Sequence, residues 1–522
     1  FLIRAYDELL NYHAYRSGKP VTELDQWERL PILIRNIFGV DLDMQAVEIA
    51  CLNLLLRSLA KRETLPSLAG NIRQGNSLIS GTEEELGSYF GDDWQEKKPF
   101  NWEQKFQDIM AEGGFDVVIG NPPYVSFGLR DLERMDKSLG LYSRDKFPNS
   151  AEYKLSTYAL FIDRGLQLLK EGGYLSYILP DSFLLGRYFS RLRKYILDNC
   201  SIKEIVLFKE DFWSSGTIGR PVIIILRKTA DASVRRENYI TANLCSSPEE
   251  LKSSKFSKTF SYSQSYFDST LYNRFRLFFD AESMNIVDKV DSHSAKLTTI
   301  VTLASGLIGK EGKNQIISPK KLSRDWLPGL LSGSEINRYA LYYKGGYILY
   351  DTAKLKSGFK DANYFESKIL MRQTGDSIIA TYDTDNLLCL NNLHVGNLIN
   401  NNYDLRYILG CLNSKLMNYY YHLISLELGR AMAQTDIETI EQLPIRRIDF
   451  DNPSEKKIHD DLVAQVDKML ELNKRLAPIR NTPCNERDEL LREINRTDSE
   501  IDNLVYDLYG LIEEERKIIE GS

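Results

Sequence analysis

One stretch constrains this chain more than any other: residues 115–125, which read FDVVIGNPPYV. Its valine and isoleucine run, residues 117–119, is β-branched, too short for a helix and closed by a glycine, so it predicts a buried strand. Two prolines follow that cannot donate ladder hydrogen bonds, and Pro122 disfavours the α conformation for Asn121. The sequence therefore predicts a rigid turn at the carboxyl end of a strand, where open α/β sheets bind their ligands.

The residues of this turn have a specific chemistry. Asn121 can offer its side-chain oxygen and its backbone carbonyl, two acceptors, to an exocyclic amine, and Tyr124 supplies an aromatic face beside them. An ordinary turn with a neighbouring aromatic residue is the alternative interpretation. The spacing favours a site that acts on an amine, but it does not identify the substrate.

The chain before this turn predicts a strand that ends in acidic residues. Residues 36–43 read as a strand, and residues 45–59 as an amphipathic helix. A carboxylate at a strand's carboxyl end can accept hydrogen bonds from both hydroxyls of a ribose, and Asp41 is our candidate for that role. Asp43 is expected to cap the helix, although both acids could be caps only.

Strands and helices continue to alternate after the turn. Helices are expected at residues 154–169 and 188–197, and strands at residues 174–179, 202–208 and 221–226. This alternation predicts a parallel, doubly wound sheet that ends in a hairpin. Two segments lack it: residues 81–114 are expected to form a surface insertion, and residues 126–152 a mobile loop that closes over substrate.

Composition narrows the class of protein. A chain of 522 residues is expected to form two or three domains. No apolar run has membrane-spanning length and no signal peptide opens the sequence, so we expect a cytoplasmic protein without a membrane partner. The six cysteines and five histidines are dispersed, which predicts neither a disulfide scaffold nor a metal centre.

The net charge of −7 is unevenly distributed. Residues 451–522 carry 18 acidic and 11 basic residues, which accounts for the whole imbalance. Residues 251–330 carry 12 basic against 7 acidic residues. Such a local basic surface is what phosphate binding requires, although an ordinary solvated face would have the same composition.

Four motifs in one order carry a resemblance to a known family. They are FGVDLDMQAVEI (38–49), FDVVIGNPPYV (115–125), STYALFIDRGLQLL (156–169) and YILPDSF (177–183). Together they resemble the gamma-class, Taq-type DNA adenine-N6 methyltransferases, in particular those of type II and type IIG restriction–modification systems. The resemblance implies an α/β, Rossmann-like domain that uses S-adenosylmethionine to methylate the N6 amine of an adenine flipped out of double-stranded DNA.

The resemblance also implies roles for individual residues. Asp41 would bind the cofactor ribose, with Leu42 and Pro123 against its adenine, and Asn76 stands where the family often has an aspartate that binds the adenine amine. The catalytic residues would be the turn itself and a second aromatic residue. These are Asn121, Pro122, Pro123, Tyr124 and Phe189, with Phe183 as the rival for the last position.

The later chain resembles the specificity domain of the same family. The segments ILMRQT (369–374), LNSKL (412–416) and QLPI (442–445) carry that likeness. We therefore expect a partial catalytic domain at residues 1–230, a mixed α+β target-recognition domain at 231–451 and a helical segment at 452–522. Five basic residues are candidates for phosphate contacts: Lys310, Lys313, Lys320, Lys321 and Arg324.

Other interpretations remain open. The Asn-Pro-Pro-Tyr motif also resembles that of RNA and protein-glutamine methyltransferases, although these would not be expected to carry so long a specificity-like region. The chain opens on a helix without the strand and glycine-rich turn that the family places before it, so we expect a fragment. A non-catalytic DNA-recognition fragment is therefore a further alternative, and any nuclease domain or subunit is expected before Phe1.

Overall fold

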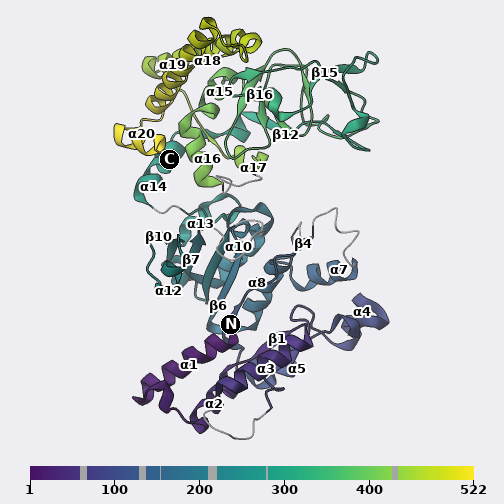
Figure 1. Ribbon diagram of the computed structural model, residues 1–522, viewed down its shortest axis with the longest axis vertical. Helices are drawn as coiled ribbons and strands as arrows, with labels where there is room; N and C mark the ends of the chain where they lie inside the picture. Colours follow the sequence, from purple (N-terminus) through teal and green to yellow (C-terminus); the bar gives the residue numbers. More distant parts are fainter. Residues whose placement is uncertain are drawn as a thin grey trace. The chain divides into compact units, whose positions relative to one another are not determined.

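The computed structural model describes residues 1–58, 67–127, 137–152, 155–209, 220–277, 280–425 and 433–521. The chain divides into two compact units, Phe1–Phe275 and Arg276–Ser522 (Figure 1). We call them unit 1 and unit 2. Each has hydrophobic clusters of its own.

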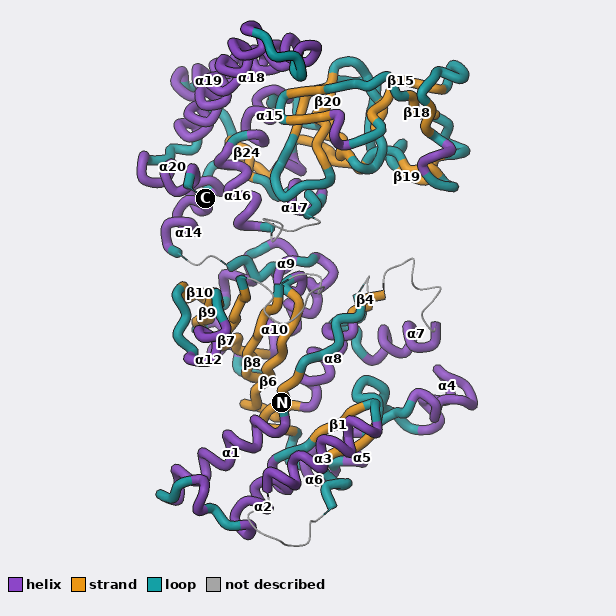
Figure 2. The backbone as a smooth tube through the Cα atoms, in the orientation of Figure 1, coloured by secondary structure: helices purple, strands orange, loops and turns teal. Residues whose placement is uncertain are grey.

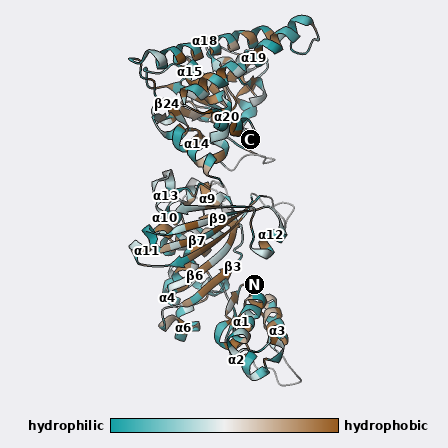
Figure 3. Ribbon diagram, turned by 90° about the vertical axis from the view of Figure 1, so that its left-hand side faces the viewer, coloured by the Kyte–Doolittle hydropathy of each residue, from teal (hydrophilic) through white to brown (hydrophobic). Residues whose placement is uncertain are grey.

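Unit 1 is built on a six-stranded sheet with the order β10-β9-β7-β8-β6-β3 (Figure 2). Its strands are β3 (Phe115–Gly120), β6 (Leu169–Pro180), β7 (Cys200–Phe208), β8 (Pro221–Lys228), β9 (Tyr239–Cys245) and β10 (Lys258–Ser263). They are largely hydrophobic, as the brown ribbon in Figure 3 shows. The predicted hairpin is confirmed, because β7 and β8 pair antiparallel. The sheet as a whole is mixed rather than parallel, since only the pairs β3–β6 and β7–β9 run in the same direction.

A separate pair of strands precedes this sheet. β1 (Gly39–Asp41) and β2 (Ile72–Gln74) pair in parallel with each other. The predicted strand is present as β3, but the prediction that it is buried is wrong. β3 is the last strand of the six-stranded sheet, and its apolar side chains Val117 and Ile119 are 57% and 46% exposed. The two sheets approach each other through aromatic packing, with the rings of Phe38 and Phe115 6.0 Å apart.

The predicted helices of unit 1 are present. The expected helices correspond to α3 (Met44–Ser58), α8 (Thr157–Leu168) and α10 (Ser190–Asn199). The remaining helices of eight or more residues in the described parts of unit 1 are α1 (Leu2–Ser17), α2 (Gln26–Asn36), α4 (Glu83–Phe90) and α7 (Lys137–Lys146). Helices α1 and α2 share one hydrophobic cluster with α3.

Two predicted loop segments differ from expectation. Residues 81–114 contain α4 and the short helices α5 (Trp102–Lys105) and α6 (Gln107–Ala111). The aromatic residues Phe100, Trp102 and Phe106 of this segment are buried against Phe115 rather than exposed, because they complete the hydrophobic cluster beside β3. The expected mobile loop contains helix α7, while its residues 128–136 lie outside the described residues.

The boundary between the units also differs from the prediction. The expected end of the catalytic domain at residue 230 falls inside the sheet of unit 1, because β9 pairs with β7 and β10 pairs with β9. The expected third region, residues 452–522, belongs to unit 2. It is held there by polar contacts such as the ion pair between Arg338 and Asp498, 2.6 Å.

Unit 2 combines small sheets with helices. Its largest sheets have the orders β12-β23-β20-β21 and β14-β18-β15-β22. Their strands are β12 (Val301–Ser305), β14 (Ile317–Ser318), β15 (Trp326–Leu330), β18 (Tyr347–Leu349), β20 (Lys368–Arg372), β21 (Ala380–Asp383), β22 (Leu388–Cys389) and β23 (Leu393–Leu398). Shorter pairs are made by β11 (Ser294–Lys296) with β24 (Pro444–Arg446), β13 (Ile308–Gly309) with β19 (Leu355–Ser357), and β16 (Ile336–Asn337) with β17 (Ala340–Leu341).

One helix, α14 (Ala281–Asp291), stands at the start of unit 2, and its other described α-helices follow the two largest sheets in the carboxyl-terminal part. They are α15 (Leu405–Asn413), α16 (Lys415–Ile424), α17 (Ile437–Ile440), α18 (Pro453–Leu476), α19 (Asn485–Leu508) and α20 (Glu513–Glu520). α18 and α19 lie side by side within the predicted helical segment (Figures 1 and 3). No helix in the described parts of the chain is both long and apolar enough to span a membrane.

Candidate functional site

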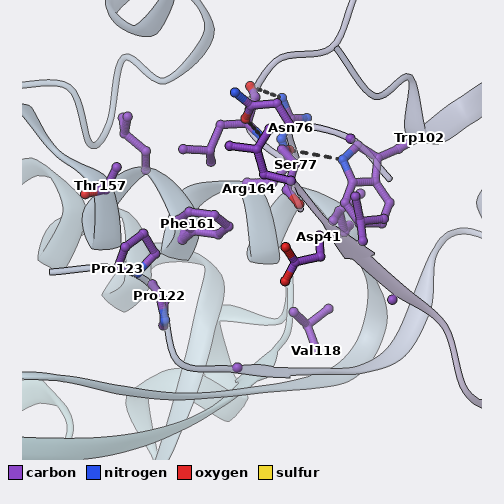
Figure 4. A pocket seen from close by; sticks show the side chains of 18 of the residues that line it. Asp41, Asn76, Ser77, Trp102, Val118, Pro122, Pro123, Thr157, Phe161 and Arg164 are labelled. Carbon is purple, nitrogen blue, oxygen red and sulfur yellow. Dashed lines mark hydrogen bonds between the residues drawn. The ribbon is translucent and has the colours of Figure 1, made fainter. Parts of the chain in front are cut away.

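Unit 1 contains a cavity of about 730 Å³ at the carboxyl ends of β1 and β3. Its walls come from β1, the turn after β2, β3 and its following turn, and helix α8. Of the predicted site residues, six line it: Asp41, Leu42, Asn76, Asn121, Pro122 and Pro123. Figure 4 shows the carboxylate of Asp41, the ring of Phe161 and the two prolines around this space.

Asp41 and Asp43 act differently at the end of β1. The Asp41 carboxylate accepts a hydrogen bond from the backbone N–H of Asp43 at 2.9 Å. Asp43 in turn accepts one from the backbone N–H of Gln45 at 3.0 Å, at the start of α3. The prediction that Asp43 caps the helix is confirmed. Asp41 keeps its second carboxylate oxygen available to a ligand, because no described residue bonds to it.

Asn76 lies in a turn that hydrogen bonds fix on several sides. Its backbone N–H donates to the carbonyl of Lys98 at 2.6 Å, and its side-chain oxygen accepts from the N–H of Leu78 at 3.1 Å. The next carbonyl, that of Ser77, accepts from the Trp102 indole at 3.1 Å. The segment expected to be a surface insertion thus braces one wall of the cavity, a role that its polar composition concealed.

The turn after β3 places its asparagine at the cavity. Asn121 is exposed, whereas Pro122 is buried. The chain beyond the turn is held by Thr157, whose backbone N–H and hydroxyl both donate to the carbonyl of Val125, at 2.9 and 2.6 Å. Because no described residue bonds to the Asn121 side chain, its amide oxygen is available as an acceptor.

The two predicted base-contacting aromatics do not line this cavity but join a cluster next to it. The ring of Tyr124 meets that of Tyr158 at 6.3 Å, and Tyr158 meets Phe189 at 5.3 Å. Phe183, the rival candidate, packs against Phe189 at 6.2 Å and is fully buried. Tyr124 and Phe189 are therefore brought close through Tyr158, for which the sequence predicted no role.

Tyr158 is a buried member of helix α8. Burial raises the pKa of Tyr158 to about 12. Hydrogen bonds of its hydroxyl group lower this pKa, but by less than burial raises it. That hydroxyl lies 3.2 Å from the Ser182 hydroxyl oxygen. Tyr158 therefore stays neutral at physiological pH and presents an uncharged aromatic wall. Tyr158 stands at an apolar position of the amphipathic helix α8, as a core residue would. The sequence therefore did not indicate that it contacts Tyr124 and Phe189.

Five other residues of α8 line the cavity, among them Phe161 and Arg164. The Arg164 guanidinium lies 5.0 Å from the centre of the Phe147 ring and donates to the Leu78 carbonyl at 3.3 Å. Burial lowers the pKa of Arg164. Arg164 thus joins the turn after β2 to the segment beyond α7, and Phe161 adds an aromatic surface to the cavity.

The five candidate phosphate-binding residues all lie in unit 2 and are all exposed: Lys310, Lys313, Lys320, Lys321 and Arg324. The Lys310 ammonium donates to the Ala353 carbonyl at 2.7 Å, and the Arg324 side chain is 95% exposed. Among the described residues, no group of three or more histidine, cysteine or acidic side chains could hold a metal ion.

Comparison with known proteins assigns both parts of the chain. Residues 35–213 match the Eco57I restriction-modification methylase family, and residues 329–445 match the TaqI-like C-terminal specificity domain. The first match includes β1, β3 and the cavity-lining turn, and the second includes β20 and β23.

Individual relatives agree. The predicted type II restriction enzyme and methyltransferase RM.MjaORFECS2P of Methanocaldococcus jannaschii is 29% identical over 430 residues, which are 80% of this chain and 33% of the relative. The type II restriction enzyme and methyltransferase RM.Eco57I of Escherichia coli is 31% identical over 233 residues, 40% of this chain and 21% of the relative. The chain thus spans a third or less of the length of these relatives.

A solved structure shows the same fold over most of the chain. It is a nuclease-deletion mutant of the Type ISP restriction-modification enzyme LlaGI, in complex with a DNA substrate mimic. The match has a TM-score of 0.56 and 12% identity, and it covers 91% of this chain and 43% of the other. The chain therefore carries a methylase domain of the Eco57I restriction-modification family followed by a TaqI-like C-terminal specificity domain.

Proposed function

We propose that this chain forms the DNA-modifying part of a restriction–modification system and transfers a methyl group from S-adenosylmethionine to the N6 amine of adenine. The observation that best supports this proposal is the position of the turn after β3. Asn121 and the two prolines line a cavity that also contains the carboxylate of Asp41, and the adjoining Tyr124 leads into an aromatic cluster. A cofactor site and a base site would thus meet at Asn121.

The cavity suits S-adenosylmethionine in size and in chemistry. Its volume of about 730 Å³ lies within the range of small-molecule sites. Asp41 would accept hydrogen bonds from the ribose hydroxyls, and Leu42 and Pro123 would contact the adenine ring. Asn76 and the ring of Phe161 add a polar and an aromatic contact. When bound, the cofactor supplies an electrophilic methyl group on a sulfonium.

Asn121 and Pro122 would activate the target amine. An exocyclic adenine amine is a poor nucleophile, because its lone pair is delocalised into the ring. The Asn121 side-chain oxygen and the Pro122 carbonyl would accept its two hydrogens, which draws the nitrogen toward a tetrahedral geometry and exposes the lone pair. Positioning and preorganised hydrogen bonds would then carry the catalysis, without a covalent intermediate on the enzyme.

The aromatic cluster would receive the flipped base. An adenine inside a duplex cannot reach Asn121, so it must leave the helix, which costs a few kcal/mol of stacking and pairing. Stacking on Tyr124, with Phe189 in the same aromatic cluster, would offset part of this cost. The exposed basic residues of unit 2 would bind phosphates of the same DNA.

The test is methyl transfer by the protein expressed from its complete reading frame. We expect labelled methyl groups from S-adenosylmethionine to appear in duplex DNA as N6-methyladenine, and transfer to be lost in Asn121→Ala. Asn53→Ala, at an exposed asparagine of α3 away from the cavity lining, is the matched control. Labelled cytosine, faster transfer to RNA or to protein, or full activity of Asn121→Ala would overturn the proposal.

A further inference from the structure

Helix α10 carries a fully buried arginine that the proposed mechanism does not use. Arg193 is 0% exposed, and its guanidinium donates to four backbone carbonyls. The acceptors are Phe183 at 2.7 Å, Gly186 at 2.8 Å, Tyr272 at 2.9 Å and Asn273 at 2.9 Å. Burial lowers the pKa of Arg193 to about 9, so it remains protonated at neutral pH. No described carboxylate forms an ion pair with Arg193. Burying its charge is costly, and the four hydrogen bonds to carbonyls offset that cost.

Two of the four carbonyls belong to the turn that precedes Phe189. This turn contains α9 (Ser182–Leu185) and Gly186. The space at Gly186 is tight, because a Cβ there would lie 3.2 Å from Cδ2 of Phe189. The backbone N–H of Phe189 also donates to the Gly186 carbonyl at 3.3 Å. The guanidinium therefore binds the residue against which the Phe189 ring rests.

The other two carbonyls belong to the last segment of unit 1. Tyr272 and Asn273 have φ angles of +58° and +51°, a left-handed conformation that is uncommon for residues other than glycine. Such a conformation persists where the surroundings impose it, and Arg193 binds both of its carbonyls. The segment then runs through Phe275, whose N–H donates to the Leu184 carbonyl at 2.8 Å, into Arg276, where unit 2 begins.

Ring contacts continue this connection to the catalytic turn. Phe275 meets Phe183 at 5.9 Å, and Phe183 meets Phe189 at 6.2 Å. From Phe189 the contacts pass through Tyr158 to Tyr124, as described above. One cation thus fixes the backbone on both sides of an aromatic cluster that reaches from the catalytic turn to the end of unit 1.

We propose that Arg193 is a positioning residue for the target base. By holding the carbonyls of Phe183 and Gly186 together with those of Tyr272 and Asn273, it sets the place of the Phe189 ring relative to Tyr124. Arg193 holds two segments of the backbone, and one of them, Tyr272–Asn273, leads into unit 2. The base pocket is therefore formed only when that segment is in place. This role rests on the proposed function, because it presupposes a base between Tyr124 and Phe189.

A conservative substitution tests the role. Arg193→Lys keeps the charge but cannot reach four carbonyls with a planar fork. Arg191→Lys is the matched control, since Arg191 lies two residues away on the same helix and its side chain is 70% exposed. We expect Arg193→Lys to lower kcat for DNA methylation by about 10- to 100-fold, with unchanged binding of S-adenosylmethionine, and the control to behave as wild type.

A double-variant cycle separates positioning from a general loss of structure. If Arg193 acts through Phe189, Arg193→Lys will change kcat by less than about twofold when Phe189→Leu is already present. Hydrogen exchange provides a readout without activity: the amides of Gly186, Phe189 and Phe275 should lose protection together in Arg193→Lys, while those of β6 keep it.

The outcomes distinguish the two proposals. Independent, multiplicative losses of kcat in the cycle, or unchanged protection at Gly186 and Phe189, would overturn the role of Arg193 while leaving the methyltransferase proposal intact. A wild-type protein that transfers no methyl group to DNA would overturn the proposed function and, with it, any role in placing a base, whatever the exchange data show.

Discussion

The cavity of unit 1 and the interior of unit 2 use polar side chains in opposite ways. In unit 1 the cavity walls present Asp41 and Asn121 to solvent, with acceptor atoms that no described residue occupies. In unit 2 charges inside the fold are paired: Lys368 and Asp383 are both 0% exposed and form an ion pair of 2.6 Å. Glu335, also in unit 2, accepts hydrogen bonds from three backbone N–H groups. Polar groups thus face an open cavity at this place in unit 1 and hold the interior together at these places in unit 2.

The strongest test of this contrast is to break the buried pair of unit 2. Lys368 donates to Asp383 and to the Tyr364 carbonyl at 2.8 Å, so Lys368→Met leaves a buried carboxylate without its cation. We expect the free energy of unfolding of unit 2 to fall by about 3–5 kcal/mol. Hydrogen exchange of β20 and β23 in increasing urea would measure it. Lys356→Met, at an exposed lysine of β19, is the control, and an equal effect there would refute the assignment.

The corresponding change in unit 1 should affect activity and spare stability. Asn121 is exposed and has no described partner, so Asn121→Ala should leave the free energy of unfolding within about 0.5 kcal/mol of wild type. Loss of one transition-state acceptor is expected to lower kcat by about 100- to 1000-fold. Initial rates of DNA methylation and thermal unfolding curves would be compared on the same preparations. A large loss of stability would show that Asn121 is a structural residue.

Surface charges of unit 2 should act on binding alone. The double substitution Lys320→Ala and Lys321→Ala removes two exposed cations. The slope of log affinity against log salt should become shallower by about 0.9 for each phosphate that the variant leaves unbound. Fluorescence anisotropy of a labelled duplex between about 50 and about 200 mM salt would measure it. An unchanged slope would place the phosphate-binding residues elsewhere on the protein.

The smallest expected effect concerns a buried histidine of unit 2. His394 is 2% exposed, its Nε2 lies 2.7 Å from the Thr435 carbonyl, and burial lowers its pKa. The unfolded chain therefore binds a proton near pH 6.5 that the folded chain does not, so stability is lost as the pH falls below about that value. The loss should reach up to about 1.4 kcal/mol per pH unit.

A non-titrating variant isolates that contribution. His394→Gln keeps an N–H donor for Thr435, so its free energy of unfolding should vary less than that of wild type between about pH 7 and about pH 5. If chemical denaturation gives the same pH dependence of the free energy of unfolding for wild type and His394→Gln, the proposed contribution of His394 is wrong.

The sequence predicted the parts of unit 1 in which local pattern and tertiary structure agree. The strand before Asn121, the helix after Asp43 and helix α8 were identified because each has its own hydrophobic period and its own end signal. Six predicted site residues line one cavity because the carboxyl ends of β1 and β3 face the same space. The roles of these residues, and of Tyr124 and Phe189, remain predictions.

What the sequence concealed depends on contacts between distant segments. Trp102 braces the turn at Asn76, yet it lies in a polar stretch without periodicity. Tyr158 and Phe161 occupy apolar positions of the buried helix α8. The spacing of apolar residues in the sequence does not distinguish a ring that faces a ligand from a ring in the core. The end of unit 1 was expected at residue 230 and lies at Phe275. The helices before β9 and β10, α11 (Ala232–Arg236) and α12 (Pro248–Ser253), are too short to show an amphipathic period, so the sequence did not indicate that these strands join the sheet.

The free side of β3 has a consequence for handling the protein. β3 ends the six-stranded sheet with Val117 and Ile119 exposed, and its only charged residue, Asp116, is already paired with Lys170. An unprotected edge of this composition is a template for pairing with a strand of another molecule, which natural proteins suppress with charges or covering segments. At high concentration this edge should therefore promote association, and a charge introduced by Val117→Lys should suppress it. Because Val117 also lines the cavity, the same change should weaken ligand binding there.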